Sequence, residues 1–348
     1  MDLLHGVGEF FALDIGTSSL RLVQLDGDAQ HGWNLSRFSY VPVDSAVIQD
    51  NSELGKKKMG EIILGAIQQA GIKCTNVAIG MPSQKSYTTI VEFPTQPMKD
   101  LEKTIKYRID QYVPMTEDQA KSDFVILGVS PNDPAKTEVL IASTANEYAE
   151  SRMEMLERIG LNVIAEEPEV LAMSRALMPF GVTDGRMVVD FGDRATDLVI
   201  MYNNLPRVVR AVPIGMESLI RTVASSLSVT NEQASQFIMK FGLAQDKVEG
   251  QVFRVLDSVL DAFAEELKKS ANYFNSKYPN VNVGGIVLSG YAEIIPFMAE
   301  YIEAKTGVST IQGNPWQMVR VTPEQQQALT SVASKFAVAI GLAERSND

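Results

Sequence analysis

The chain has 348 residues, a formal net charge of −12 and a sequence pI near 4.8, so we expect no nucleic-acid partner, because phosphate recognition needs clustered Lys and Arg. One cysteine and two histidines exclude an intrachain disulfide framework and a histidine-based metal cage. The 45% hydrophobic content suits two cores, and without a long apolar segment or an export signal we expect a cytoplasmic protein.

The first predicted strands flank a polar turn. Apolar runs at 10–13 and 20–25 enclose the sequence DIGTSS, and another strand is predicted at 35–43. Apolar residues at helical spacing predict a helix over 59–70, and a strand over 77–81 follows. The beginning of the chain is therefore predicted to be a mixed α/β layer.

The rhythm changes after Pro82. Alternation and helical spacing predict strand 87–93, helix 98–113, strands 124–129 and 139–144, helix 145–159 and strand 161–165. We interpret this order as a compact β-α-β-β-α-β unit, inserted between about 83 and 160.

The second half repeats the pattern of the opening. The sequence VVDFGDRATDLVI has an apolar strand, an aspartate, a glycine, a polar loop and a second apolar strand, as FALDIGTSSLRL has. Asp14 and Asp190 stand in matching positions. A repeated unit of this kind is more specific than either copy alone, so we predict an internal duplication.

A glycine-bearing turn with small hydroxyl residues can expose backbone N–H groups to an anion. Gly16 and Gly192 allow close approach of a phosphate, and Thr17, Ser18 and Ser19 add hydroxyl donors. Unpaired carboxylates beside phosphates are suitable ligands for magnesium. The alternative interpretation is that each aspartate only caps its turn, but the duplication favours the functional one.

A third element lies near the end of the second half. The segment 281–302 predicts a strand, a Ser-Gly turn and a helix, and Gly290 could admit an adenine or ribose against the backbone. Glu266, Lys269 and Ser270 on the preceding helix could reach a nucleoside or form a solvated face. Neither a P-loop nor a complete dinucleotide-binding glycine motif is present.

These stretches together resemble the superfamily of actin-like, sugar-kinase and heat-shock-chaperone ATPases. LDIGTSSLRL is similar to its first phosphate motif, VVDFGDRATDL to its second and VLSGYAEIIPFM to its adenosine motif. AEEPEVLAMSRAL and FAVAIGLAERSND resemble its two connecting helices. The motifs follow in the expected order over nearly the whole chain.

Within the superfamily, the chain resembles the PilM family of type IV pilus assembly proteins, close to the FtsA branch. The segment beginning VAIGMPSQKSYTTI is similar to the insertion of that family, and NLPRVVRAVPIGMESLIRTV to its second-lobe hairpin. FtsA itself would add a membrane-binding C-terminal helix, which ERSND does not resemble, and MreB lacks the insertion.

The resemblance implies an actin-like α/β fold, with two ribonuclease-H-like lobes around a nucleotide cleft. Lobe I would comprise 1–82 and 161–175, lobe II 176–330, and the α+β insertion 83–160. The helix at 331–348 would return to lobe I.

The resemblance also implies bound ATP, with Mg²⁺ held through water by Asp14 and Asp190. The expected nucleotide contacts are Gly16, Thr17, Ser18, Ser19, Arg21, Gly192, Asp193, Arg194, Ala195, Gly215, Glu266, Lys269, Gly290 and Tyr291. Glu167 holds the position from which such proteins orient the attacking water, although it could equally be an acid that stabilises a helix start.

The sequence departs from the superfamily at two positions. Arg194 stands where the second phosphate loop has a small residue, and it could pair with phosphate or fill the cleft. Tyr291 replaces a glycine of the adenosine motif, and it could stack on the base or obstruct it. We therefore expect weak ATPase activity or none.

The resemblance implies a cytoplasmic scaffold that binds the N-terminal tail of an inner-membrane protein similar to PilN and links pilus motor ATPases to the envelope complex. The tail would lie between lobe I and the insertion, with Met81, Ile90, Phe93 and Ile109 as candidate groove walls. The chain would reach the inner membrane only through partners. The alternatives are a filament protein of cell division or shape, and a sugar or acid kinase.

Overall fold

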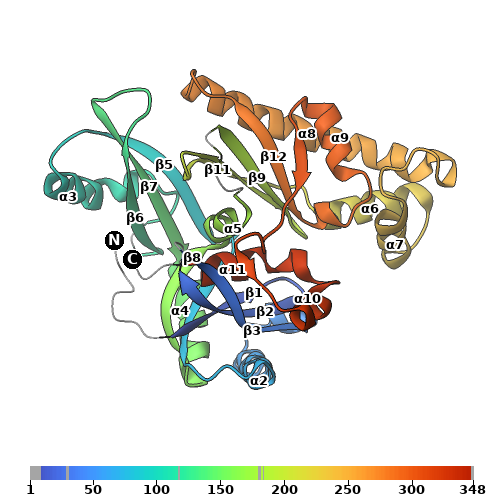
Figure 1. Cartoon of the computed structure of the whole chain (residues 1–348), viewed down its shortest axis with the longest axis horizontal. Coiled ribbons are helices and arrows are strands. Elements are labelled where there is room, and N and C mark those ends of the chain that lie inside the picture. The colour runs from blue at the N-terminus through green and yellow to red at the C-terminus, as the bar shows by residue number, and fades with distance from the viewer. Residues whose placement is uncertain (1–8, 29–30, 117, 179–181, 183, 346–348) are drawn as a thin grey trace. The chain divides into compact units, whose positions relative to one another are not determined.

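The computed structural model describes residues 9–345, apart from 29, 30, 117, 179–181 and 183. Its chain divides into two compact units (Figure 1). The first comprises Met1–Ser130, Ala135–Ala176 and Asn314–Asp348, and the second comprises Pro131–Pro134 and Leu177–Gly313. Within the described residues, no helix is both long enough and apolar enough to cross a membrane.

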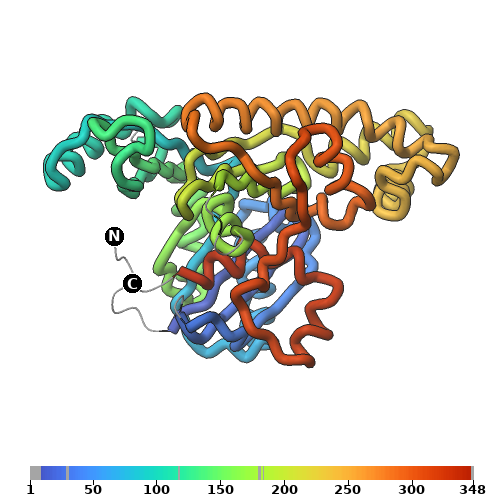
Figure 2. Tube along the Cα trace, turned by 45° about the horizontal axis from the view of Figure 1, so that its top comes forward, coloured from blue at the N-terminus to red at the C-terminus, as the bar shows by residue number. Residues whose placement is uncertain are grey.

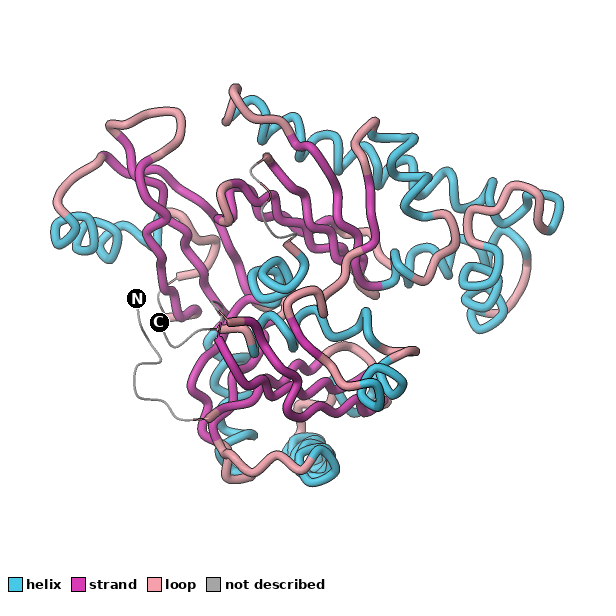
Figure 3. The backbone as a smooth tube through the Cα atoms, in the orientation of Figure 1, coloured by secondary structure: helices cyan, strands magenta, loops and turns pink. Residues whose placement is uncertain are grey.

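A six-stranded sheet forms the centre of the first unit, in the order β14-β3-β2-β1-β4-β8 (Figure 3). Strands β1, β2 and β3 are antiparallel neighbours, β14 runs parallel to β3, and β4 and β8 run parallel to β1. The strands are β1 (Phe10–Ile15), β2 (Ser19–Asp28), β3 (Gly32–Pro42), β4 (Asn76–Met81), β8 (Asn162–Pro168) and β14 (Val319–Arg320). Strand β14 pairs with β3, which groups residues 314–330 with the first unit and not with the second lobe of the sequence prediction.

Helices cover both faces of this sheet. On one face, Phe11, Leu13 and Ile79 share a core with Ile63 of α2 and Leu156 of α4. On the other face, α11 packs against β1, β2 and β4. The helices are α1 (Ser45–Gln49), α2 (Glu53–Ala70), α4 (Asn146–Arg158), α5 (Glu169–Leu177), α10 (Pro323–Leu329) and α11 (Ala337–Ala343).

The crossing of α5 and α11 depends on a glycine. All seven residues of α11 are buried, and its sequence AVAIGLA is mostly small. A Cβ at Gly341 would collide with the backbone of Ala172 on α5. The two helices that the sequence predicted as connecting helices are therefore packed backbone to backbone within the first unit.

The insertion contains a small antiparallel sheet in the order β5-β7-β6. Its elements are β5 (Ser86–Pro94), α3 (Met98–Arg108), β6 (Ala120–Val129) and β7 (Lys136–Ala145). Helix α3 packs Leu101 and Ile105 against Phe93 and Ile141 of this sheet. The helix ends before the predicted 113, because a short 3₁₀ turn begins at Ile109.

The insertion differs from the expected β-α-β-β-α-β unit in its last two elements. Strand β8 pairs with β4 in the six-stranded sheet. Helix α4 places Met155 and Leu156 in the core of the six-stranded sheet, and its Arg158 forms an ion pair with Glu53 of α2 at 2.5 Å. In the described residues, the core of the insertion therefore comes from strands β5, β6 and β7 and helix α3.

The second unit has a five-stranded sheet in the order β11-β10-β9-β12-β13. Three antiparallel strands are followed by two that run parallel to β9. Its elements are β9 (Gly185–Phe191), β10 (Thr196–Tyr202), β11 (Leu205–Val212), α6 (Met216–Leu227), α7 (Asn231–Phe241), α8 (Gln251–Lys277), β12 (Val283–Gly290), α9 (Met298–Thr306) and β13 (Thr310–Gln312). Figure 2 shows α8, with 27 residues, as a long continuous helix of this unit.

The two sheets have the same connectivity. In each sheet, three consecutive strands form an antiparallel ladder. Two later strands lie beside the first of the three and run parallel to it. The first strands are β1 and β9, which carry Asp14 and Asp190. The duplication that the sequence predicted is therefore present in the topology of the fold.

Candidate nucleotide site

The first phosphate loop is a tight turn between β1 and β2. The Gly16 amide donates to the Ser19 carbonyl at 3.0 Å, which closes the turn. Thr17 and Ser18 at its tip are exposed, and Ser19 is buried. The hydroxyls of Thr17 and Ser18 are thus the donors of this loop that face outward.

An arginine lies over this turn. Arg21 stands opposite Asp14 in the β1–β2 register, and its Nη1 is 2.5 Å from Oδ2 of Asp14. Its Nη2 donates to the Ser19 hydroxyl at 3.0 Å. A Cβ at Gly16 would lie 2.6 Å from the guanidinium, so a larger residue there would require Arg21 to shift from its contact with Asp14. Asp14 is buried and neutralised by Arg21, which places a cation at the phosphate loop.

The second phosphate loop repeats the geometry of the first. The Gly192 amide donates to the Ala195 carbonyl at 3.1 Å, as Gly16 does to Ser19. The loop is supported by the start of α6, because the Met216 and Glu217 amides donate to the carbonyls of Gly192 and Asp193. These two helix amides are therefore occupied by the loop backbone.

The charges beside the two loops differ. Asp197 of β10 stands opposite Asp190 of β9, at the position that Arg21 has opposite Asp14. The first loop thus carries a neutral Asp–Arg pair, and the second carries two carboxylates on neighbouring strands. Carboxylate oxygens are suitable ligands for a divalent cation. The Asp190–Asp197 pair is therefore a better candidate for binding magnesium than the Asp14–Arg21 pair. Asp197 is not among the residues predicted from the sequence; the signal for it is that it follows Asp190 by seven positions, as Arg21 follows Asp14.

Gly215 and Arg194 shape the second loop. A Cβ at Gly215 would lie 2.6 Å from the Asp193 carbonyl oxygen, so this glycine supports the loop by close packing. Arg194 is exposed, and its Nε lies 3.5 Å from Glu217 on α6. Burial and the nearby Glu217 raise the pKa of Asp193. The Arg194 side chain therefore lies beside the loop and pairs with the Glu217 carboxylate.

The predicted adenosine motif packs directly on the second loop. Gly290 has φ +67°, and a Cβ there would collide with the Asp190 carboxylate and the Phe191 carbonyl. Ser289 stands opposite Asp190 in the β12–β9 register, and its buried hydroxyl has no hydrogen-bond partner among the described residues. Tyr291 is half-buried and packs against the core of the second unit.

Glu266 and Lys269 of α8 form an ion pair with each other. Lys269 Nζ is 2.7 Å from Glu266 Oε1, and Arg210 of β11 lies 3.4 Å from Oε2. Arg210 also donates to the Ser270 hydroxyl at 2.9 Å. These four residues form one polar cluster on the face between α8 and β11.

Glu167, the residue before the last of β8, lies in a buried ionic cluster of the first unit. Its carboxylate lies 2.5 Å from Arg175 of α5 and 2.8 Å from Arg345, which follows α11. Burial alone would raise the pKa of Glu167, but the charges of Arg175 and Arg345 lower it. Arg175 also donates to the Gly341 carbonyl. Both oxygens of this carboxylate are thus engaged by arginines.

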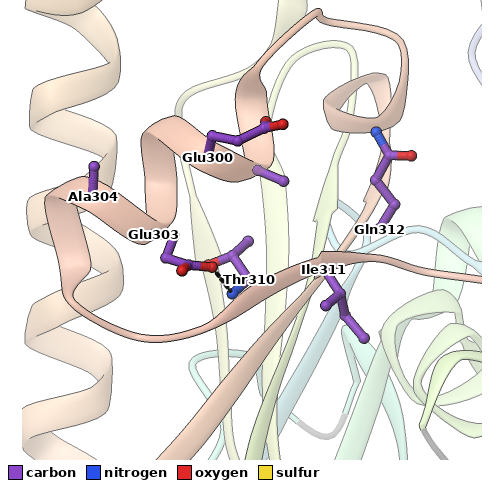
Figure 4. Close-up of a pocket in the computed structure, with 7 residues that line it drawn as sticks. Glu300, Glu303, Ala304, Thr310, Ile311 and Gln312 are labelled. Carbon is purple, nitrogen blue, oxygen red and sulfur yellow. Dashed lines mark hydrogen bonds between the residues drawn. The ribbon is translucent and has the colours of Figure 1, made fainter.

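A separate pocket of the second unit lies between α9 and the edge strand β13 (Figure 4). Glu300 and Glu303 line it with Ile311 and Gln312, and Glu303 accepts a hydrogen bond from the Thr310 amide at 2.9 Å. It contains none of the predicted site residues.

Each unit therefore gathers its own predicted residues. The first brings together Asp14, Gly16, Ser19 and Arg21 at one turn, and holds Glu167 in a separate ionic cluster. The second gathers Asp190, Gly192, Gly215 and Gly290 around the other turn, as their packing distances require. Glu266 and Lys269 lie in their own ion-paired cluster on α8.

Two sheets of the same connectivity, each with an aspartate and a glycine turn at the end of its first strand, define a protein of the actin-like fold. The chain belongs to the family of the type IV pilus assembly protein PilM, whose family model matches residues 12–347. The resemblances drawn from the sequence, to the actin-like superfamily and to this family, are confirmed.

Solved structures give the same fold. The chain is similar to a protein in a PilM-PilN type IV pilus biogenesis complex, with a TM-score of 0.80, 20% identity and coverage of 98% of this chain and 99% of that one. It is similar to the ethanolamine utilization protein EutJ from Carboxydothermus hydrogenoformans, with a TM-score of 0.56, 16% identity and coverage of 97% and 89%. MreB5 of Spiroplasma citri bound to ADP has a TM-score of 0.53 and 12% identity, with coverage of 96% and 95%.

Proposed function

We propose that the chain is an ATP-binding scaffold of type IV pilus assembly, which binds the cytoplasmic N-terminal tail of an inner-membrane protein similar to PilN. The observation that carries the nucleotide part is the repeated turn, closed by the same hydrogen bond at Gly16 and Gly192. Membership of the PilM family supports the assembly role. The tail partner is supported by the likeness to a chain of the PilM-PilN complex.

Each turn carries residues that suit one part of a magnesium nucleotide. Arg21 supplies a guanidinium beside the exposed hydroxyls of Thr17 and Ser18, which is a suitable set for phosphate oxygens. Asp190 and Asp197 supply carboxylate oxygens on neighbouring strands. A magnesium ion held there would neutralise phosphate charge. In this proposal Asp14 acts through Arg21, because its carboxylate already forms an ion pair.

The proposal assigns ATP a binding role with little or no turnover. A general base must be able to approach water and accept its proton. The carboxylate of Glu167 is instead held by Arg175 and Arg345, which lower its pKa. The two arginines therefore make Glu167 a weak base in a fixed orientation.

Calorimetry tests the nucleotide part. Binding of ATP should require magnesium, and Asp190→Ala should weaken it by at least about tenfold, which corresponds to about 1.4 kcal/mol. Asp246→Ala provides a control, because Asp246 is an exposed aspartate of the same unit that pairs with Lys247 and is not a predicted site residue. Unchanged affinity in Asp190→Ala would contradict the proposed metal site.

The tail is proposed to bind at the seam between lobe I and the insertion. Two candidate walls from the sequence are unsuitable, because Met81 and Phe93 are buried in the two separate cores. Ile90 and Ile109 are only half-buried. Tyr87 adds an exposed ring at the start of β5, where the neighbouring Ser86 hydroxyl donates to the Pro82 carbonyl of lobe I.

Co-purification tests the scaffold part. The nucleotide-loaded chain should recover a bitopic pilus protein from cell membranes, and Tyr87→Asp should lose it. Val129→Asp is a matched control, since Val129 is also exposed but ends β6 at the far end of the same small sheet. Phosphorylated small products without a membrane partner would instead favour a kinase. The link to pilus motor ATPases would follow if these also co-purify.

A further inference from the structure

Helix α3 of the insertion carries a basic stripe along its outer face. Its inner face is fixed by Leu101 and Ile105, which are buried in the core of the insertion. Opposite to them, Lys99, Lys103 and Tyr107 follow one another at intervals of four residues, so they form one line along the helix. Lys106 lies beside this line. Figure 1 shows α3 next to the β5–β7–β6 sheet.

The three lysines of the stripe are exposed and make no ion pair within the described residues. Acidic neighbours are nevertheless available on α3, since Asp100 and Glu102 precede lysines at helical spacing. On α8, the same three-residue spacing gives ion pairs of 2.6 Å and 2.7 Å. The α3 lysines are therefore exposed and not paired with Asp100 or Glu102 of their own helix.

Tyr107 has an unusual environment for an aromatic residue. Its side chain is 85% exposed, so nearly all of its ring faces water. A ring with a polar tip beside lysines is the combination found at the level of lipid headgroups, where the ring enters the interface and ammonium groups meet phosphates.

We propose that the α3 stripe contacts the headgroups of an anionic membrane. The proposal goes beyond the scaffold role, because it requires neither nucleotide nor the protein tail. The charge of the stripe is opposite to that of the lipid, whereas the whole chain has a net charge of −12. Charges more than about 10 Å apart are largely screened at 0.1 M salt, so the local stripe can bind while the acidic remainder is directed away.

An acidic protein surface is the less suitable partner. Interfaces between proteins are enriched in arginine, whose planar fork pairs with carboxylates, and depleted in lysine. Lysine provides three of the four basic residues of α3, and Arg108, like Lys106, lies beside the line of Lys99, Lys103 and Tyr107. Lysine acts as a point charge with a flexible stem, which suits a fluid headgroup layer.

Vesicle co-sedimentation of the full chain tests the proposal. At about 50 mM salt, the chain should bind vesicles of equal parts phosphatidylglycerol and phosphatidylcholine, but not pure phosphatidylcholine. Each lysine is expected to contribute about fivefold to binding, so Lys99→Gln with Lys103→Gln should weaken it about 25-fold. Tyr107→Ser should weaken it further at constant charge.

The matched control is Lys57→Gln with Lys58→Gln, which removes the same charge from two exposed lysines of α2. This variant should retain binding. Both double-lysine variants should have the same unfolding midpoint as the original chain, because the four lysines are exposed. No binding to phosphatidylglycerol, or equal loss in the α2 and α3 variants, would overturn the proposal. If vesicles are not bound but the α3 variant loses a protein partner in detergent, the stripe binds protein instead.

Discussion

Asp197 stands opposite Asp190 across β9 and β10, whereas Arg21 stands opposite Asp14 across β1 and β2. Both second residues follow the aspartate by seven positions, so the duplicated hairpins place opposite charges at the same point. The first turn therefore carries an aspartate with an arginine, and the second carries two carboxylates. Because carboxylate oxygens are suitable ligands for magnesium, this difference makes the second turn the better candidate for the proposed metal site.

Asp197→Asn should separate binding from stability. Asn is nearly the same size as Asp, so the variant should keep an unfolding free energy within about 1 kcal/mol of that of the original chain. It should also bind magnesium-ATP at least about tenfold more weakly. Urea unfolding and calorimetry measure the two effects. A variant that loses stability but keeps its affinity would show that Asp197 is only structural.

Gly290→Ala should damage the second turn, since a Cβ there would collide with the Asp190 carboxylate. At φ +67° and ψ −138° its backbone also lies in a region that essentially only glycine adopts, and we expect a total loss of about 2–4 kcal/mol in unfolding free energy. Gly307→Ala is the control for an ordinary left-handed backbone, because Gly307 has φ +72° and ψ 12° and nothing lies within 4 Å. It should lose only about 1 kcal/mol and keep nucleotide affinity. Equal losses in both variants would contradict the packing argument.

The repeated turns could be predicted from sequence because they are local. An apolar strand, an aspartate and a glycine determine a strand end and a tight turn, and the actual bonds at Gly16 and Gly192 have that form. The predicted bounds of α4 are likewise within one residue of those observed, whereas α2 begins six residues before the predicted 59 and α3 ends five residues before the predicted 113.

Long-range partners could not be predicted in the same way. Arg345 lies 178 positions from Glu167, and only the packing of α11 against the sheet brings the two together. The pairing of β14 with β3 joins segments from opposite ends of the chain, so the boundary of the second unit was not visible in local patterns. The buried positions of Met81 and Phe93 also depend on which sheet face each residue occupies.

The ion pairs of Arg175 and Arg345 with Glu167 predict slow hydrolysis of ATP. Steady-state turnover of ATP should stay below about 1 s⁻¹, and Glu167→Gln should leave this rate unchanged. A large decrease of the rate in Glu167→Gln would show that this carboxylate takes part in catalysis.

The same two ion pairs predict which arginine contributes more to the unfolding free energy. Arg175→Ala should lower the unfolding free energy by about 3 kcal/mol, because it leaves a buried carboxylate with one partner fewer and removes the bond to the Gly341 carbonyl. Arg345→Ala should cost less, about 1–2 kcal/mol, since Arg175 remains. Denaturant unfolding near pH 7 measures both. The reverse order would contradict the assigned contacts.

Glu344, at the end of α11, should make stability fall as pH rises. Burial raises the pKa of Glu344 to about 7, although the charge of Arg175 lowers it, and its Oε1 has no hydrogen-bond partner among the described residues. The ordinary pKa of an unfolded Glu is about 4.3, so the folded state binds the proton more tightly. Its contribution to stability is therefore complete below about pH 4.3 and is lost as the pH rises through about 7.

Glu344→Gln keeps an uncharged group at every pH. The stability of this variant relative to the original chain should increase by about 2–3 kcal/mol between pH 5 and pH 8, as measured by urea unfolding. Asp246→Asn is the control, because Asp246 is exposed and its pKa is lowered by the side-chain hydrogen bond with Lys247. A difference between Glu344→Gln and the original chain that is constant with pH would show that Glu344 is ionised throughout this range.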